Sequence, residues 1–162
     1  MSAHESPFVL RVVDVAMQGP LEVQHALDAV ADAAFGGIDV FIGRVRAHNQ
    51  GRVVTGLHYD MFDPLAIAVF ARAASKARTE FGPALRCYVA HAKGHLVVGD
   101  TAVIVAVATP HRDEAFRACR AVIEVVKHEA PIWKQEHYID GSSAWTEGCS
   151  LCGSEPGAVA AP

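Results

Sequence analysis

Residues 101–109, T-A-V-I-V-A-V-A-T, decide the fold class of this chain. Every position between the two threonines is apolar, and valine and isoleucine favour an extended backbone. A strand that is apolar on both faces is buried on both faces. We therefore expect this segment at the centre of a sheet whose faces are covered by helices.

Further strands are predicted on either side of this segment, from runs rich in β-branched and aromatic residues. They cover residues 8–15, 38–47, 53–62, 85–92, 132–139 and 144–146. The turn sequence H-N-Q-G-R (48–52) predicts that the second and third of these strands form a hairpin. The glycine-containing segment 93–100 predicts a turn, in which His91 and His95 flank Lys93-Gly94 as ordinary exposed histidines.

Three segments are predicted as helices from apolar residues at helical spacing. The first covers residues 20–35, and the second covers residues 65–81 after Asp63 as N-cap. The third lies between Pro110 and Pro131. Its apolar stripe is expected to consist of Ala115, Phe116, Cys119, Ile123 and Val126.

The order of these elements predicts an α+β domain with a mainly antiparallel sheet and three main helices. Residues 1–152 are expected to form a single domain, followed by a disordered C-terminal tail over residues 153–162. The composition is typical of a folded protein, since 51% of residues are hydrophobic and 20% are charged.

The charge balance excludes several classes of partner. The formal net charge is −4 with histidines neutral, so no overall field attracts nucleic acid or an acidic membrane.

Residues 1–7 lack the pattern of a secretion signal, and no apolar run approaches the roughly 20 residues that span a bilayer. We expect a cytoplasmic protein whose cysteines, Cys87, Cys119, Cys149 and Cys152, are reduced thiols.

Two motifs suggest a metal site, but neither has the required spacing. His128-Glu129 begins like the zinc motif H-E-x-x-H, yet the fifth position is Ile132 and Pro131 would end the helix. Cys149-x-x-Cys152 supplies one thiolate pair, whereas a structural zinc site needs four ligands. The sequence therefore predicts no metal and no cofactor.

Basic side chains occur at two predicted element ends. Arg44 and Arg46 end a strand, and His111-Arg112 lies at a helix N-terminus, where backbone N–H groups already favour an anion. One hypothesis is a shared phosphate site. The alternative is that each group is a solvated surface feature.

Two lysines surround the turn at Pro131. Lys127 in a last helical turn can simply complement the helix dipole. Lys134 shares a strand face with Ile132 and Glu136, so packing is expected to hold its ammonium in place. If the strand folds back along the helix, the two lysines converge, and one becomes usable as a nucleophile or an acid/base group.

Five stretches carry a specific combination of motifs, which includes H-R-x-x-A-F and P-I-W-K-x-E. They are F-I-G-R-V-R (41–46), G-R-V-V-T-G-L-H-Y-D-M-F (51–62), G-H-L-V-V-G-D (94–100), P-H-R-D-E-A-F-R-A-C (110–119) and V-K-H-E-A-P-I-W-K-Q-E (126–136). In these stretches the chain resembles the catalytic, larger subunit of molybdopterin synthase. Their order and spacing extend the resemblance over roughly residues 8–147.

The resemblance implies an α/β hammerhead-type fold and a homodimer with a small ubiquitin-like sulfur-carrier subunit at each end, which makes a heterotetramer. The partner's Gly-Gly C-terminus carries a thiocarboxylate that enters the active site. Sulfur is transferred twice to cyclic pyranopterin monophosphate, which forms the dithiolene of molybdopterin. The implied activity is that of a sulfurtransferase in molybdenum cofactor biosynthesis.

By the same resemblance, Lys127 and Lys134 form the catalytic pair beside the partner's terminal glycine. Arg46, His111 and Arg112 hold the pterin phosphate and its surroundings. The complete substrate site that it implies consists of Arg44, Val45, Arg46, His111, Arg112, Lys127, Lys134, Gln135 and Glu136.

The chain departs from the family pattern at a few positions. Ala92 stands where arginine is frequent, and Asp60 and Phe62 stand where Glu and Tyr are common. The segment after Trp145 lacks an arginine that some members place there. A second hypothesis is therefore a non-catalytic assembly factor that binds a pterin or a ubiquitin-like tail, although retention of both lysines favours the enzyme.

Overall fold

β6 (Thr101–Thr109) lies inside the sheet, as its sequence predicted, and every residue from Ala102 to Thr109 is buried. The structure is a computed structural model that describes residues 6–147, so the predicted tail over 153–162 lies outside the described residues. β2 (Gly37–Arg44) and β5 (Arg86–Val97) pair with β6 on its two sides, both in antiparallel orientation.

β5 joins the two parts of the sheet. Through Lys93 it pairs in parallel with β1 (Phe8–Asp14), and from Gly94 onward it pairs with β4 (Arg52–Met61) instead. Gly94 has a φ of +103°, which glycine adopts without a steric penalty. The strand can therefore change direction where it changes partner.

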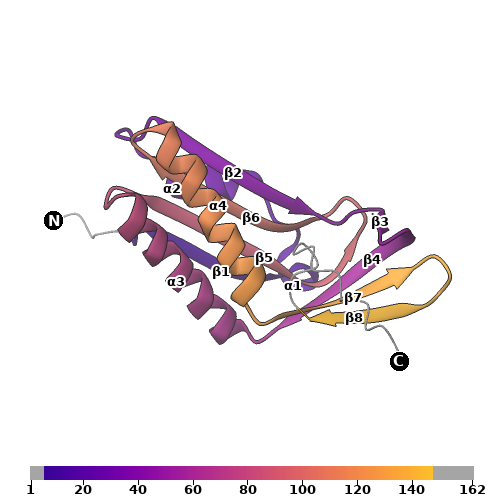
Figure 1. Ribbon diagram of the computed structural model, residues 1–162. Helices are drawn as coiled ribbons and strands as arrows, with labels where there is room; N and C mark the ends of the chain where they lie inside the picture. Colours follow the sequence, from indigo (N-terminus) through magenta and orange to yellow (C-terminus); the bar gives the residue numbers. More distant parts are fainter. Residues whose placement is uncertain (1–5, 148–162) are drawn as a thin grey trace, which may run out of the picture.

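The second part of the sheet extends beyond the helices (Figure 1). β7 (Ile132–Tyr138) pairs with β4, and β8 (Ser143–Glu147) pairs with β7 as the last strand. The short β3 (His48–Asn49) pairs with the start of β4. The complete strand order is β2-β6-β5-β4-β7-β8, with β1 beside β5.

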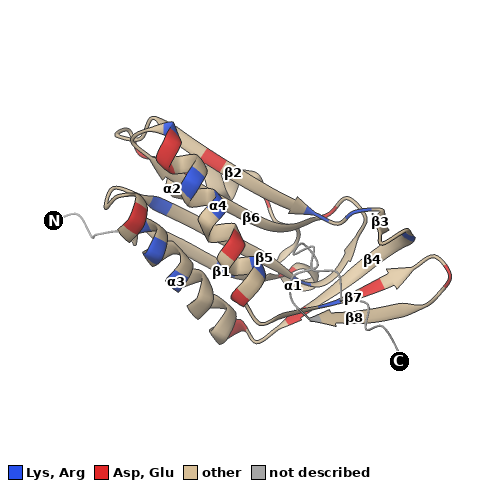
Figure 2. Ribbon diagram, viewed as in Figure 1, with Lys and Arg blue, Asp and Glu red and all other residues tan. Residues whose placement is uncertain are grey.

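Helices cover both faces of the first part of the sheet. α3 (Asp63–Phe81) and α4 (Arg112–Glu129) pack against each other on one face, with charged residues on their outer sides (Figure 2). α2 (Val23–Val30) packs on β5 and β6 from the opposite face, and α1 (Val15–Gln18) is a single turn. The structure confirms the predicted α+β fold with a mainly antiparallel sheet and three main helices. Among the helices of residues 6–147, none is both long and apolar enough to cross a membrane.

Two predictions about strands are wrong. β2 does not form a hairpin with β4, because β2 runs along β6 and only β3 turns back onto β4. Residues 93–97 do not form a turn, because β5 continues to Val97. His91 and His95 are therefore strand residues, and His91 is buried. Local alternation identifies a strand, but it does not identify the strand's partner.

The first helix is shorter than predicted. α2 ends at Val30, because Arg86 of β5 holds the residues that follow. Its guanidinium donates to the Ala31 carbonyl at 3.2 Å and lies 3.4 Å from the Asp32 carboxylate.

Details of the other two helices also differ from the prediction. Phe62 occupies the N-cap position of α3, while the carboxylate of Asp63 accepts a hydrogen bond from Lys93 Nζ at 2.8 Å. In α4, Phe116 is 58% exposed. The buried face of that helix is completed by Ala118 and Val122 instead.

Candidate active site

A cavity of about 360 Å³ lies where three parts of the chain meet. Its walls are the last turn of α4, the segment that leaves β2, and the inner face of the β4–β7 pair. Figure 2 shows basic residues where β2 ends and on β7. A cavity of this size can hold a small organic ligand.

Both predicted catalytic lysines line this cavity. Lys127 lies in the last turn of α4. After Ala130 the chain reverses, with the Ile132 N–H donating to the Ala130 carbonyl at 2.8 Å, and continues into β7. Lys134 returns to the same cavity from this strand, so the turn at Pro131 brings a helix lysine and a strand lysine to one site.

Lys134 is held by a buried carboxylate. Its Nζ lies 2.9 Å from Glu136 Oε1, and the side chains of Lys134 and Glu136 are only 13% and 4% exposed. The same carboxylate accepts hydrogen bonds from Asn49 Nδ2, at 3.0 Å to Oε1 and 2.8 Å to Oε2. The Tyr138 hydroxyl donates to Oε2 at 2.7 Å. Each oxygen of Glu136 is thus contacted by two groups: Oε1 by Lys134 and Asn49, and Oε2 by Asn49 and Tyr138.

These contacts keep Glu136 ionised. Burial raises the pKa of its carboxyl, but the hydrogen bonds from Tyr138, Asn49 and Lys134 and the charge of Lys134 outweigh burial. The pKa of Glu136 therefore lies below its ordinary value. The site contains a fixed negative charge directly beside one of its lysines.

Tyr59 and His91 also line the cavity, and both are uncharged at neutral pH. Burial, with a smaller contribution from the Glu136 charge, raises the pKa of Tyr59 to about 12. Burial, with a smaller contribution from the Lys127 charge, lowers the pKa of His91 to about 3. The His91 ring meets the Tyr59 ring edge-on at 4.9 Å between centroids. His91 Nδ1 lies 2.8 Å from the Ala92 carbonyl, so the neutral ring donates there and leaves Nε2 as an acceptor.

The last residue of β2 and the two residues that follow it line the cavity and supply its guanidinium groups. Arg44, Val45 and Arg46 all line it, and Val45 is buried while both arginines are exposed. Arg44 Nε donates to the Gly99 carbonyl in the β5–β6 turn at 2.8 Å, which fixes that side chain. Both arginines are more exposed than Lys127 and Lys134, the two lysines of the same cavity.

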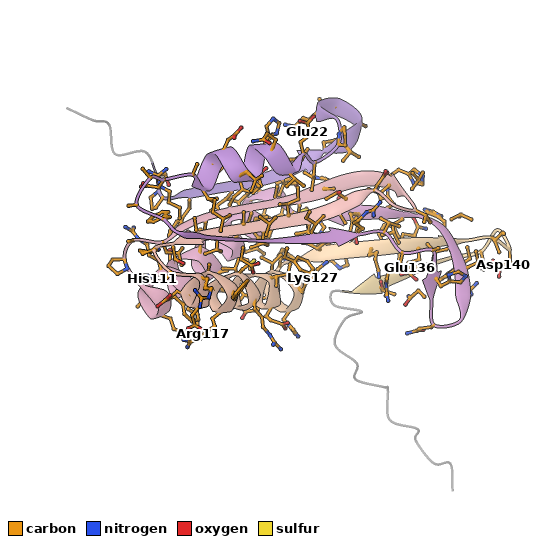
Figure 3. All side chains as sticks on the ribbon, turned by 90° about the horizontal axis from the view of Figure 1, so that it is seen from above. Glu22, His111, Arg117, Lys127, Glu136 and Asp140 are labelled. Carbon is orange, nitrogen blue, oxygen red and sulfur yellow. The ribbon has the colours of Figure 1, made fainter. Side chains whose placement is uncertain are left out.

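Three predicted site residues do not line the cavity. Gln135 points to the other face of β7, where its amide donates to Ser143 Oγ at 3.1 Å. His111 and Arg112 lie at the N-terminal end of α4, whereas Lys127 lies at its C-terminal end (Figure 3). Within one chain, the structure does not bring the His-Arg pair and the lysines together.

Sequence reasoning did not identify Asn49, Tyr59 and His91 as part of the site. Asn49 belongs to a predicted turn, and nothing in its neighbourhood indicates a partner 87 positions away. His91 could have been found, because it lies between Ala90 and Ala92 in a run of β5 that is buried on both faces. A strand that runs through His91 places its side chain in the core instead of in a turn.

Within residues 6–147, no three His, Cys, Asp or Glu side chains come together as ligands for a metal ion. The Cys149/Cys152 pair lies outside this range. Cys87 and Cys119 are buried. Burial raises the pKa of both thiols, and nearby Asp39 adds to the rise at Cys119. Both are core residues with little tendency to react.

The fold and the cavity define an α+β protein in which two lysines and two arginines line one cavity large enough for a small molecule. The sequence pattern of the family described as MoaE protein matches residues 16–129. A molybdopterin synthase catalytic subunit from Synechococcus elongatus is 46% identical over 133 residues, which are 82% of this chain and 81% of the relative. Its counterpart from Mycobacterium tuberculosis is 42% identical over 127 residues, 76% of this chain and 83% of the relative. The chain belongs to the MoaE family, the catalytic subunits of molybdopterin synthase.

Solved structures agree with this assignment. The crystal structure of molybdopterin synthase from Staphylococcus aureus matches with a TM-score of 0.77 at 29% identity, covering 88% of this chain and 98% of the other. A complex of subunits 1 and 2 of molybdopterin-converting factor from Helicobacter pylori has the same fold, with a TM-score of 0.65 at 24% identity over 91% and 93% of the two chains. The predicted family and the predicted role as an enzyme of molybdenum cofactor biosynthesis are confirmed.

Proposed function

We propose that this chain transfers sulfur from the C-terminal thiocarboxylate of a small ubiquitin-like partner to cyclic pyranopterin monophosphate, with Lys127 and Lys134 as the catalytic pair. The observation that carries the proposal is the single cavity that both lysines line together with Arg44 and Arg46. In a chain with a net charge of −4, this concentration of cations serves a local purpose.

The chemistry requires fixed positive charge. The partner's thiocarboxylate and the pterin phosphate are both anions. When the thiocarboxylate sulfur bonds to a side-chain carbon of the pterin, a C–O bond at that carbon breaks, its oxygen leaves with the electron pair, and a thioester remains. Negative charge then develops on the acyl oxygen when water adds to that thioester. Lys134 and Lys127 can stabilise that charge or supply a proton to it. Water then takes the acyl group, which leaves the sulfur on the pterin and an ordinary carboxylate on the partner.

Family membership and a solved structure of the same fold support the choice of partner. The Helicobacter pylori structure is described as a complex of two subunits of molybdopterin-converting factor, and one of its chains has the same fold as this chain. We propose a corresponding small sulfur-carrier subunit here, whose Gly-Gly tail enters the cavity. Two such transfers provide the two sulfur atoms of the dithiolene.

A second copy of the chain would complete the substrate site. Arg112 and Lys127 are separated by 15 helical positions, which correspond to roughly 22 Å along α4. One pterin cannot contact both ends of the same helix. We propose that His111 and Arg112 of one chain serve the cavity of the other chain in a homodimer, so that the complete enzyme is a heterotetramer.

A single-turnover assay tests the proposed activity. Purified chain, thiocarboxylated partner and cyclic pyranopterin monophosphate should release molybdopterin, and omission of any component should abolish it. The matched control is a partner with an ordinary C-terminal carboxylate. Binding of partner and pterin without product would support the alternative, a non-catalytic assembly factor, and would contradict the proposal.

A further inference from the structure

The hydrogen bonds around Glu136 have a consequence for how Lys134 is held. Its neighbours come from separate parts of the chain: Asn49 from β3, and Lys134 and Tyr138 from β7. Glu136 is 3% exposed, and it is the one acidic side chain among the described residues that line the cavity. A buried carboxylate without donors would take up a proton and lose its hold on a neighbouring ammonium.

We propose that Asn49 and Tyr138 are positioning residues of the sulfur-transfer site, which act on Lys134 by keeping the Glu136 carboxylate ionised and fixed in orientation. The proposal rests on the function proposed above. Neither residue needs to touch the substrate, and the hydroxyl of Tyr138 reaches the cavity only through Glu136.

The geometry supports a positioning role. Lys134 and Glu136 lie two positions apart on one face of β7, so a flexible lysine side chain is held by a neighbour on a rigid strand. Asn49 Nδ2 lies within hydrogen-bonding distance of both carboxylate oxygens, and the Tyr138 hydroxyl donates a second hydrogen bond to Oε2. A carboxylate held in this way has one orientation available, and its remaining contact is Lys134.

Tyr138 is itself held in place. The Arg52 guanidinium lies 3.5 Å from the centroid of the Tyr138 ring, and Arg52 also pairs with Asp140 at 3.0 Å. Arg52 begins β4 and Asp140 follows β7, so the stacking joins the two strands at the end remote from Lys127. A series of contacts from Arg52 through Tyr138 and Glu136 to Lys134 thus extends from the edge of the β4–β7 pair to the cavity wall.

Tyr138→Phe tests the proposal, because it keeps the ring stacked on Arg52 and removes one donor to Glu136. We expect kcat in the sulfur-transfer assay to fall about 10-fold with little change in KM for the pterin. We also expect the acid limb of the kcat–pH profile to move to higher pH. Tyr88→Phe is the matched control, since it removes a buried tyrosine hydroxyl from β5, and Tyr88 does not line the cavity.

Asn49→Asp is the second variant. It keeps the shape of the side chain but places a carboxylate against Glu136, so one of the two must be protonated. The shift of the acid limb should exceed that of Tyr138→Phe. The other charged or titratable groups that line the cavity are Arg44, Arg46, His48, Tyr59, His91 and Lys127, and all of them are unchanged in both variants.

A readout independent of activity separates this inference from the proposed function. In protein labelled with ¹³C at the glutamate carboxyls, the Glu136 resonance should titrate below the ordinary glutamate range, and in Tyr138→Phe it should titrate at higher pH. The inference is overturned if that resonance does not move, or if kcat falls equally in Tyr138→Phe and Tyr88→Phe without a pH shift. Full activity of Lys134→Ala in the same assay would instead contradict the proposed function.

Discussion

At the scale of single residues, Lys134 differs from a surface lysine because a strand, a buried carboxylate and the cavity wall fix its position. Lys134→Ala should lower the single-turnover rate of sulfur transfer by at least about 100-fold while the chain still binds its partner. Lys134→Arg should recover little, because a guanidinium keeps the charge but does not readily give up a proton.

The comparison with Lys127 is part of the same test. Lys127→Ala should also be severely impaired, and a double variant should be no worse than the poorer single variant if the two lysines act as a unit. Partner binding by Lys134→Ala, measured by calorimetry, is the control for folding. Near-normal product formation by Lys134→Ala would reduce that lysine to a structural strand residue.

His91 predicts a pH dependence of stability. Its pKa is about 3 in the folded chain and near 6.5 in the unfolded chain, so below about pH 6.5 only the unfolded state binds the proton. Stability therefore falls as pH falls from about 6.5 toward 3, and the effect is absent above that window. Between pH 7 and pH 5, wild type should lose about 2 kcal/mol more than His91→Gln in urea unfolding.

His95→Gln is the control for this measurement, because His95 lies on the same strand with an exposed ring. All measurements need one chain concentration, since association stabilises the folded state. If wild type and His91→Gln lose the same free energy of unfolding between pH 7 and pH 5, the His91 ring accepts a proton in the folded chain.

At the scale of elements, the start of β2 and the start of α4 are in close contact. A Cβ atom on Gly37 would lie 2.9 Å from Arg112 Cα and 3.0 Å from its N, both of them backbone atoms. Gly37→Ala should therefore destabilise the chain by about 1–3 kcal/mol through overpacking. Urea unfolding at neutral pH measures this, and stability equal to wild type would show that α4 can shift without cost.

The elements also show what a sequence can and cannot predict. Residues 101–109 identify a central strand by themselves, because burial on both faces requires apolar residues at every position. The hairpin predicted between 38–47 and 53–62 is wrong, because strand pairing depends on which surfaces remain uncovered after the whole chain has folded. Gly94 suggested a turn, whereas its positive φ lets β5 continue and change partner.

The site was predictable to a similar extent. Lys127, Lys134 and Arg46 come from short local motifs, and all three line one cavity. Asn49 depends on a contact between distant segments, and no local pattern indicates it. The local motif around His111 and Arg112 suggested a role in the same site, yet a single chain leaves them at the far end of α4.

At the scale of the whole molecule, the separation of Arg112 from Lys127 along α4 predicts an active site that is shared between two chains. Light scattering should give about twice the chain mass of 17.3 kDa, because the proposed homodimer lets one chain supply Arg112 to the lysines of the other. Arg112→Ala and Lys134→Ala homodimers should each be inactive. A mixed dimer of one Arg112→Ala chain and one Lys134→Ala chain contains one intact composite site and one doubly defective site.

Mixed dimers purified through two different affinity tags should therefore recover about half of the wild-type single-turnover yield. Two wild-type chains carrying the same pair of tags are the control for purification and for exchange between dimers. The recovery has a physical reason: Lys134 of the first chain and Arg112 of the second remain unmodified and meet at one cavity. If the purified mixed dimer is no more active than either parent, the phosphate contacts do not cross between chains. If Arg112→Ala homodimers are fully active, Arg112 has no role at the site.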